Sequence, residues 1–188
     1  MSRKYGDMNI PNTLTVMRII LVPVIIILLM QGAFFKALIL FAITGITDGL
    51  DGFLARYLDQ QTTLGAYLDP IADKALIMSC FITLSVKNVI PGWLTVIVIS
   101  RDCIILLGIS VLALMSVPYE IRPSRISKAT TALQILAVIY VLATRSFALP
   151  ADIGWLLYAV FAVTAIFTAI SGLDYLFRGI RLMNQTTK

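Results

Sequence analysis

The stretch DGLDGFLARYLDQQTTLGAYLDPIAD carries Asp48, Asp51, Asp69 and Asp73 inside a chain that is otherwise strongly apolar. If the backbone is helical there, Asp48 and Asp51 lie three residues apart on one helix face, and Asp69 and Asp73 lie four apart on another. Four carboxylates gathered from two such faces cannot all stay ionised without a compensating cation. Hard divalent cations prefer oxygen ligands, so the pattern predicts a site for Mg²⁺ or Mn²⁺.

The composition of the whole chain is that of a membrane protein. Its 188 residues are 59% hydrophobic and 13% charged, with a mean hydropathy of +0.93, which is too apolar for a soluble domain of this size. No linker, low-complexity segment or repeat interrupts it, so we expect residues 1–188 to form a single all-α, polytopic domain. The six predicted transmembrane helices are Asn12–Met30, Phe34–Arg56, Leu64–Val86, Pro91–Met115, Ser124–Thr144 and Asp152–Phe177.

The second and third predicted helices reach the required length only if they include their aspartates. Their uncharged runs are short, Ala37–Thr47 and Ala75–Val86, whereas a helix needs about 20 residues to cross the hydrocarbon core. Both acidic turns adjoin the same loop, Tyr57–Thr63. The carboxylates are therefore expected to converge in a polar site at one membrane–water boundary.

The distribution of basic residues predicts which side of the membrane this boundary faces. With the amino terminus in the cytoplasm, the opposite loops hold only Lys36, Lys87 and Arg145. This orientation follows the positive-inside rule and predicts a multi-pass protein of the cell (inner) membrane, with both termini and the active site facing the cytoplasm. The net charge of +5 then fits loops that face anionic lipid, not a nucleic-acid partner. The cytoplasmic basic residues are Arg3, Lys4, Arg56, Arg122, Arg125, Lys128, Arg178, Arg181 and Lys188.

Two further features exclude classes of site. The chain contains no histidine, which removes His-dependent nucleophilic catalysis and His-ligated zinc. Cys80 and Cys103 lie in separate apolar stretches and are interpreted as small core residues, not as a disulfide or metal pair. Met1–Ile10 is polar and mildly basic, so no cleavable signal peptide is expected.

Residues 48–73 fit the pattern D-x2-D-G-x2-A-R-x8-G-x3-D-x3-D, which fixes eight positions over 26 residues. This pattern resembles the signature of the CDP-alcohol phosphatidyltransferase family, and the similarity extends over nearly the whole chain, including NIPNTLTVMR (Asn9–Arg18). The resemblance implies an enzyme that displaces CMP from a CDP-linked lipid, CDP-diacylglycerol, by an alcohol hydroxyl. It also implies a homodimer.

The resemblance assigns a role to each aspartate. Asp48, Asp51 and Asp69 would be ligands of a two-metal site, and Asp73 would be the general base while also touching the second metal. Two divalent ions can clamp the attacking and leaving oxygens with little other chemistry required of the protein. A carboxylate near metals is a weak base, which suffices because the metal-polarised reaction demands little of it.

Small residues beside the aspartates favour a pocket for the CDP-lipid. Gly52 and Ala55, next to Arg56, leave room for a flat base or a phosphate, and Gly65 lets the third helix begin close to the second. Small residues also mark packed interfaces between membrane helices, which is the alternative interpretation. Within the full motif we predict that Gly52, Ala55, Arg56 and Gly65 bind the CDP-lipid.

Polar residues of the first predicted helix belong to the same prediction. Asn12, Thr15 and Arg18 recur every three residues and therefore share one face. Arg18, inside an apolar helix, needs a partner. The resemblance implies that this face, with Asn12 and Thr15, lines the nucleotide pocket. The alternative is an interhelical hydrogen-bond cluster.

A second basic set consists of Arg101, Arg122, Arg125 and Lys128. Arg101 and Asp102 interrupt an apolar run, so they face either the site or each other. The other three surround the start of the fifth predicted helix, where they could anchor the topology on anionic headgroups or bind a phosphate on the acceptor. We predict that all four bind the acceptor.

The acceptor itself is predicted from two segments. VIPGWLTVIVISRD (Val89–Asp102) and RPSRISKATTALQ (Arg122–Gln134) resemble the cardiolipin synthases of the CDP-diacylglycerol-using type. Phosphatidylglycerophosphate synthases resemble the amino-terminal half strongly. We therefore favour phosphatidylglycerol as the acceptor, with glycerol 3-phosphate as the alternative. Intramembrane carboxylates also mark divalent-cation channels and carriers, but here the aspartates gather at one boundary and do not extend through the bilayer.

Overall fold

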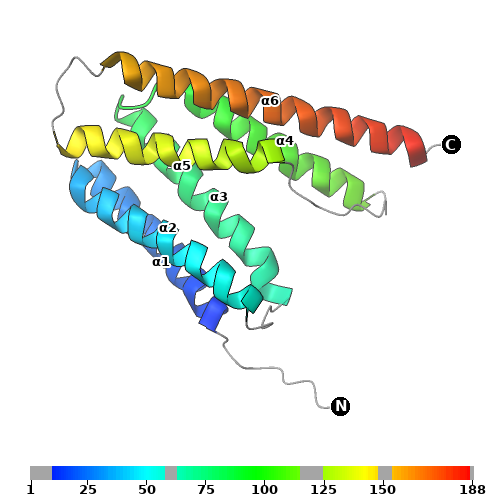
Figure 1. Ribbon diagram of the computed structural model, residues 1–188, viewed down its shortest axis with the longest axis horizontal. Coiled ribbons are helices and arrows are strands. Elements are labelled where there is room, and N and C mark those ends of the chain that lie inside the picture. Colours follow the sequence, from blue (N-terminus) through cyan, green and yellow to red (C-terminus); the bar gives the residue numbers. More distant parts are fainter. Residues whose placement is uncertain (1–9, 58–62, 115–124, 148–153, 187–188) are drawn as a thin grey trace. The chain divides into compact units, whose positions relative to one another are not determined.

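The computed structural model describes the backbone of residues 10–57, 63–114, 125–147 and 154–186, and the side chains of residues 17–47, 74–108, 125–147 and 154–179. Throughout these residues the fold is all-helical, as predicted, and it consists of six helices (Figure 1). Their bounds are α1 (Ile10–Met30), α2 (Phe34–Tyr57), α3 (Thr63–Val86), α4 (Gly92–Leu114), α5 (Arg125–Ser146) and α6 (Gly154–Thr186).

The helix bounds agree with the sequence prediction to within two residues at every end but one. The exception is α6, which continues to Thr186, well beyond the predicted end at Phe177. The prediction ended where the apolar run ends, but a helix can continue through polar residues. Arg178 donates a 2.9 Å hydrogen bond from Nε to the carboxylate of Asp174, four residues earlier, which supports the helix where the apolar run stops.

The turn after α1 is a Schellman motif. Gly32 adopts a φ of 75°, a left-handed conformation that glycine takes without a steric penalty. Its N–H donates to the carbonyl of Leu29 at 3.0 Å, and the N–H of Ala33 donates to the carbonyl of Leu28 at 2.9 Å. These two bonds satisfy carbonyls left open by the end of α1 and turn the chain into α2.

The turn after α3 repeats the motif with asparagine in place of glycine. Asn88 has a φ of 56°, and its N–H donates to the carbonyl of Ser85 at 2.9 Å. The N–H of Val89 donates to the carbonyl of Leu84, also at 2.9 Å. Asparagine is the residue that most often replaces glycine at this position. Pro91 follows and ends the turn immediately before α4 begins.

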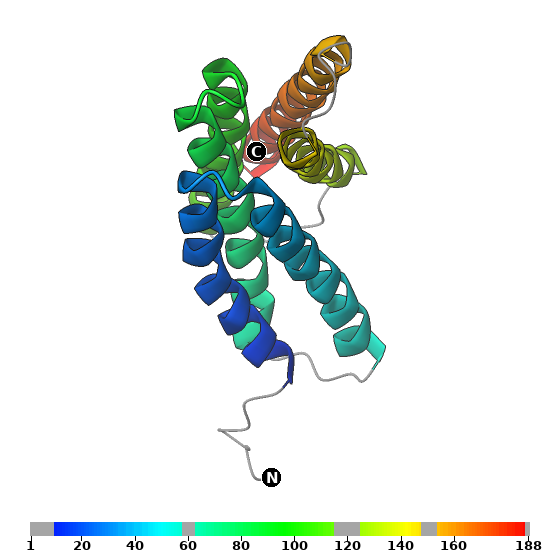
Figure 2. The same ribbon diagram turned by 90° about the vertical axis from the view of Figure 1, so that its left-hand side faces the viewer.

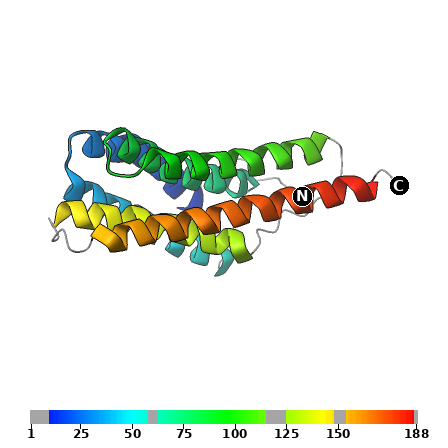
Figure 3. The same cartoon turned by 90° about the horizontal axis from the view of Figure 1, so that it is seen from above.

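The chain groups into two compact units, each described here by itself. The first unit holds Met1–Thr83 and Leu142–Ala148, and the second holds Leu84–Val141 and Leu149–Lys188. A compact unit need not fold independently, so the expectation of a single domain stays a prediction. In the first unit α1 and α2 form a hairpin (Figures 1 and 2). In the second, α4 and α6 run alongside each other in the same direction (Figure 3).

The surface of the described residues is unusually apolar. Large hydrophobic side chains such as Ile20, Trp155 and Phe177 are 62%, 72% and 70% exposed. Two helical stretches of the described residues, Arg125–Ser146 and Gly154–Gly179, are long and apolar enough to cross a membrane. Exposed apolar surface and long apolar helices are consistent with a membrane protein. Shorter apolar stretches occupy Met17–Met30, Phe34–Thr47 and Lys74–Val86.

Cys80 is buried, Cys103 is exposed, and both are free thiols. The expectation that both are core residues holds for Cys80 alone.

Candidate functional site

The four aspartates of the motif all lie on helical backbone. Asp48 and Asp51 belong to α2, and Asp69 and Asp73 belong to α3. Their side chains are outside the described set, but residues three or four apart in a helix share a face. The local structure on which the metal prediction depends is thus present, and a donor set made only of carboxylates suits Mg²⁺ or Mn²⁺. Among the described side chains, no group of three or more His, Cys, Asp or Glu could hold a metal.

The residues predicted to bind the CDP-lipid have described backbones but not described side chains. Asn12 and Thr15 lie in α1, and Gly65 lies at the start of α3. Gly52, Ala55 and Arg56 lie in the last part of α2, directly after the first aspartate pair. Arg122, from the acceptor set, lies outside the described residues.

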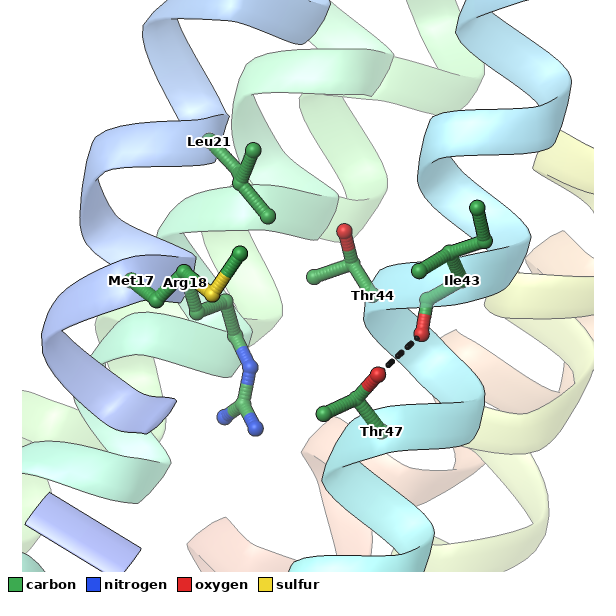
Figure 4. A pocket seen from close by; sticks show the side chains of 6 residues that line it. All are labelled: Met17, Arg18, Leu21, Ile43, Thr44 and Thr47. Carbon is green, nitrogen blue, oxygen red and sulfur yellow. Dashed lines mark hydrogen bonds between the residues drawn. The ribbon is translucent and has the colours of Figure 1, made fainter. Parts of the chain in front are cut away.

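A pocket of about 40 Å³ lies between α1 and α2, where the described part of these helices approaches the motif. This volume can hold at least one bound water. Figure 4 shows Arg18 extending from α1 into the space between the helices, at the level of Thr47 on α2. Arg18 and Thr44 are both buried, at 4% and 3% exposed. The six lining residues are Met17, Arg18, Leu21, Ile43, Thr44 and Thr47.

The threonines of this pocket lie one helical turn before the first aspartate pair on α2. Thr44 precedes Asp48 by four residues and Thr47 precedes Asp51 by four, so all four positions lie on one face of α2. The threonine hydroxyls donate to carbonyls one turn earlier, at 2.7 Å in both cases. Their oxygens can still accept a hydrogen bond. Sequence analysis missed both residues, although their spacing from the aspartates could have revealed them.

Arg101 is buried in the second unit and joins three helices. Its Nη1 donates a 2.6 Å hydrogen bond to the carboxylate of Asp102, within an ion pair whose side chains are 3% and 1% exposed. Its Nη2 donates to Ser127 of α5 at 2.5 Å and to Ser171 of α6 at 2.9 Å. The ring of Tyr175 lies 5.9 Å from the guanidinium carbon. The sequence left open whether Arg101 and Asp102 face the site or each other, and in the structure the two side chains face each other.

The polar contacts between α5 and α6 continue beyond Arg101 along both helices. The hydroxyl of Thr130 donates to the carbonyl of Phe167 at 3.1 Å, and the side-chain amide of Gln134 donates to Thr168 at 3.3 Å. Ser127, Thr130 and Gln134 are spaced by three and four residues and therefore form one stripe along α5. Sequence analysis missed this stripe, because single polar residues in an apolar segment do not reveal their partners.

Arg125 and Lys128 are exposed in the first turn of α5. They lie three residues apart and share a face, while Ser127, between them in the sequence, is buried. The first turn of α5 thus turns a serine inward and two cations outward. These two predicted acceptor residues are accessible to an anion.

Comparison with known proteins identifies the family. Residues 8–170 match the family described as CDP-alcohol phosphatidyltransferase. The chain belongs to this family. The match includes the whole aspartate motif, all of α1 to α5 and the first part of α6.

Individual relatives carry different names. The chain is 36% identical to "Cardiolipin synthase (CMP-forming)" of Rattus norvegicus, over 89% of this chain and 60% of the rat protein. It is 35% identical to "Probable phosphatidylglycerophosphate synthase" of Mycobacterium tuberculosis, over 92% of this chain and 82% of that one. It is also 35% identical to "CDP-diacylglycerol--glycerol-3-phosphate 3-phosphatidyltransferase" of Pseudomonas fluorescens, over 90% and 89% of the two chains. These near-equal identities leave the acceptor undecided between the predicted one and its alternative.

Proposed function

We propose that this protein is a membrane-embedded phosphatidyltransferase that uses CDP-diacylglycerol as the donor and releases CMP. The observation that carries the proposal is the complete aspartate motif on helical backbone of α2 and α3, in a chain that belongs to the CDP-alcohol phosphatidyltransferase family. Two helix faces that each carry a carboxylate pair supply the ligands that a pyrophosphate-cleaving site requires.

Each aspartate has a defined task in the proposed mechanism. Asp48, Asp51 and Asp69 would hold two divalent cations, Mg²⁺ or Mn²⁺, which when bound would neutralise the charge that develops on the pyrophosphate. Asp73 accepts the proton of the acceptor hydroxyl and contributes to the ligand set. The hydroxyl oxygen bonds to the phosphorus that carries diacylglycerol, and the bond from that phosphorus to the bridging oxygen breaks. CMP leaves with the bridging oxygen.

Binding of the donor is assigned to residues around the aspartates. Gly52 and Ala55 leave space beside the α2 carboxylates for the cytidine, and Arg56 is placed to contact a phosphate. Asn12 and Thr15 of α1 and Gly65 of α3 complete the proposed CDP-lipid site. Arg18, buried between α1 and α2, lines a pocket together with Thr44 and Thr47. It supports the binding of polar groups on this side of α1, because a buried cation needs polar partners.

We place the acceptor at the basic set of the second unit, with phosphatidylglycerol as the acceptor and cardiolipin as the product. The exposure of Arg125 and Lys128 supports this assignment, because both cations can meet the phosphate of an anionic acceptor. Arg122 belongs to the same set by sequence, and Arg101 belongs to it through its hydrogen bond to Ser127. Glycerol 3-phosphate is the second candidate, because the Pseudomonas fluorescens relative whose name contains it matches this chain at nearly the same identity as the rat cardiolipin synthase.

The proposed setting is a cell (inner) membrane crossed by all six helices, with both termini and the aspartates on the cytoplasmic side. The long apolar helices and the exposed apolar side chains support a membrane location. The excess of basic residues in the predicted cytoplasmic segments supports the orientation. A homodimer is proposed on the family resemblance.

The test is CMP release by the purified protein in detergent, with Mg²⁺ and CDP-diacylglycerol, comparing phosphatidylglycerol and glycerol 3-phosphate as acceptors. The lipid product is identified by chromatography, and Asp69→Asn serves as the inactive control. CMP and cardiolipin formed with phosphatidylglycerol alone would support the proposal. CMP formed with glycerol 3-phosphate alone would establish the second candidate, and no metal-dependent release with either acceptor would refute both.

A further inference from the structure

The guanidinium group of Arg101 is hydrogen-bonded inside the protein more fully than direct binding of the acceptor would require. All three of its guanidinium nitrogens bond within the protein: Nε and Nη2 to Ser171, Nη1 to Asp102, and Nη2 also to Ser127. The side chain is 3% exposed, and its charge is balanced by Asp102. A cation held in this way cannot move to an anion without breaking several hydrogen bonds in a buried site, which would be costly.

We propose that Arg101 is a positioning residue, which sets the first turn of α5 so that Arg125 and Lys128 face the acceptor. The proposal rests on the proposed function, in that these two cations bind the acceptor. Arg101 would act on them through Ser127, and not by touching the acceptor itself. Asp102 and Ser171 then share this positioning role, because they fix the guanidinium group that holds Ser127.

The helix geometry explains how one hydrogen bond can orient two cations. Ser127 is the third residue of α5 and lies between Arg125 and Lys128 in the chain. Successive residues of an α-helix are turned by about 100°, so fixing Ser127 toward the protein interior fixes the directions of its neighbours. Arg125 and Lys128 are exposed, as this orientation requires.

The other end of the contact is equally well fixed. Ser171 is fully buried in α6 and accepts from two nitrogens of Arg101, at 3.3 Å and 2.9 Å. Tyr175, one turn further along α6, places its ring 5.9 Å from the guanidinium carbon. The hydrogen bonds from Thr130 to Phe167 and from Gln134 to Thr168 then hold α5 to α6 over the next two turns. Arg101 therefore holds the first turn of α5 in a fixed position against both α4 and α6.

The kinetic test uses two substitutions that leave the exposed cations in place. Arg101→Lys keeps a charge beside Asp102, but a single ammonium cannot reproduce the three-way contact of the planar guanidinium. Ser127→Ala removes only the hydroxyl. We expect each to raise the KM for the acceptor roughly tenfold, the factor for losing a hydrogen bond to a charged group, while the KM for CDP-diacylglycerol stays within about twofold. Ser127→Thr keeps the hydroxyl and should stay near the parent. Matched controls are Arg178→Lys, in an exposed pair, and Ser146→Ala, whose hydroxyl bonds to Leu142 within α5.

A second readout does not depend on catalysis. Amide hydrogen exchange over residues 125–131 should be faster in Arg101→Lys and Ser127→Ala than in the parent and the controls. The reason is that the first turn of α5 has lost its hydrogen bond to Arg101. Unchanged exchange in both variants would overturn the proposal. So would an acceptor KM that Arg101→Lys preserves and Arg101→Ala raises, since that pattern means direct contact by charge. If the parent releases no CMP with either acceptor, the proposed function fails, and the exchange result still decides whether Arg101 holds α5.

Discussion

The guanidinium of Arg101 and the carboxylate of Asp102, neighbours in the chain, form a 2.6 Å hydrogen-bonded ion pair that is almost completely buried. Burying two charges is costly, and their attraction offsets that cost only when both are present and well hydrogen-bonded. Ser127 and Ser171 provide additional hydrogen bonds to the arginine. The stability of the second unit should therefore respond differently to breaking the pair and to replacing it.

Asp102→Asn breaks the pair and leaves a buried, uncompensated guanidinium. We expect it to lower the free energy of unfolding by about 3–5 kcal/mol, the usual cost of removing one partner of a buried pair. Replacing both residues, Arg101→Met with Asp102→Leu, should recover much of that loss because no charge stays buried. Unfolding by SDS titration in mixed micelles measures both variants.

The control for this prediction is Asp174→Asn. It removes a pair in which Arg178 is 53% exposed, and such pairs contribute about 0–1 kcal/mol. If Asp102→Asn destabilises the protein no more than this control, the Arg101–Asp102 pair does not contribute as argued.

The aspartates of α3 should separate binding from catalysis. Asp69→Asn is expected to abolish turnover, because a neutral amide is a poor ligand for Mg²⁺. Asp73→Asn should retain binding of CDP-diacylglycerol but lose CMP release, because no base accepts the acceptor's proton. Binding is measured by titration with the donor lipid and turnover by CMP release. Activity above a few per cent of the parent in Asp69→Asn would refute its role as a ligand, and lost donor binding in Asp73→Asn would make that residue chiefly a ligand.

The helices could be predicted from the sequence because long apolar runs and their polar ends are local signals. Five helices have both ends within two residues of the predicted ones. The end of α6 could not be predicted, because it depends on polar residues that continue a helix already formed. The partners of Arg101 could not be predicted either. Ser127 and Ser171 lie 26 and 70 residues away from it, and their approach depends on which helix faces pack together.

Arg18 should influence metal binding from its place between α1 and α2. It lines the pocket with Thr44 and Thr47, one turn before Asp48 and Asp51 on the same face of α2. A buried cation near this face repels an incoming metal ion. Arg18→Met, of similar length but neutral, should therefore bind Mg²⁺ roughly threefold or more tightly and be less stable without metal. Thermal unfolding across a Mg²⁺ titration measures both effects.

The matched control for Arg18 is Arg145→Met, because Arg145 is exposed in the last turn of α5. It should leave the Mg²⁺ dependence of the unfolding temperature unchanged. Equal Mg²⁺ affinity in Arg18→Met and the parent would mean that Arg18 does not act on the aspartates.

Gly172 of α6 gives a steric test of the same packing around Arg101. A methyl group built at Gly172 would lie 3.5 Å from Cγ and 3.8 Å from Cβ of Arg101, which is ordinary van der Waals contact. Gly172→Ala should therefore fold normally, with stability changed by no more than about 1 kcal/mol. Gly172→Leu must push the arginine stem aside, and we expect a loss of about 1–3 kcal/mol, typical of overpacking. Gly108→Leu is the control, since nothing lies within 4 Å of its methyl position. If the two leucine variants are equally stable in SDS titration, α6 does not pack against Arg101 as described. If Gly172→Leu raises the acceptor KM and Gly108→Leu does not, the position of Arg101 governs acceptor binding.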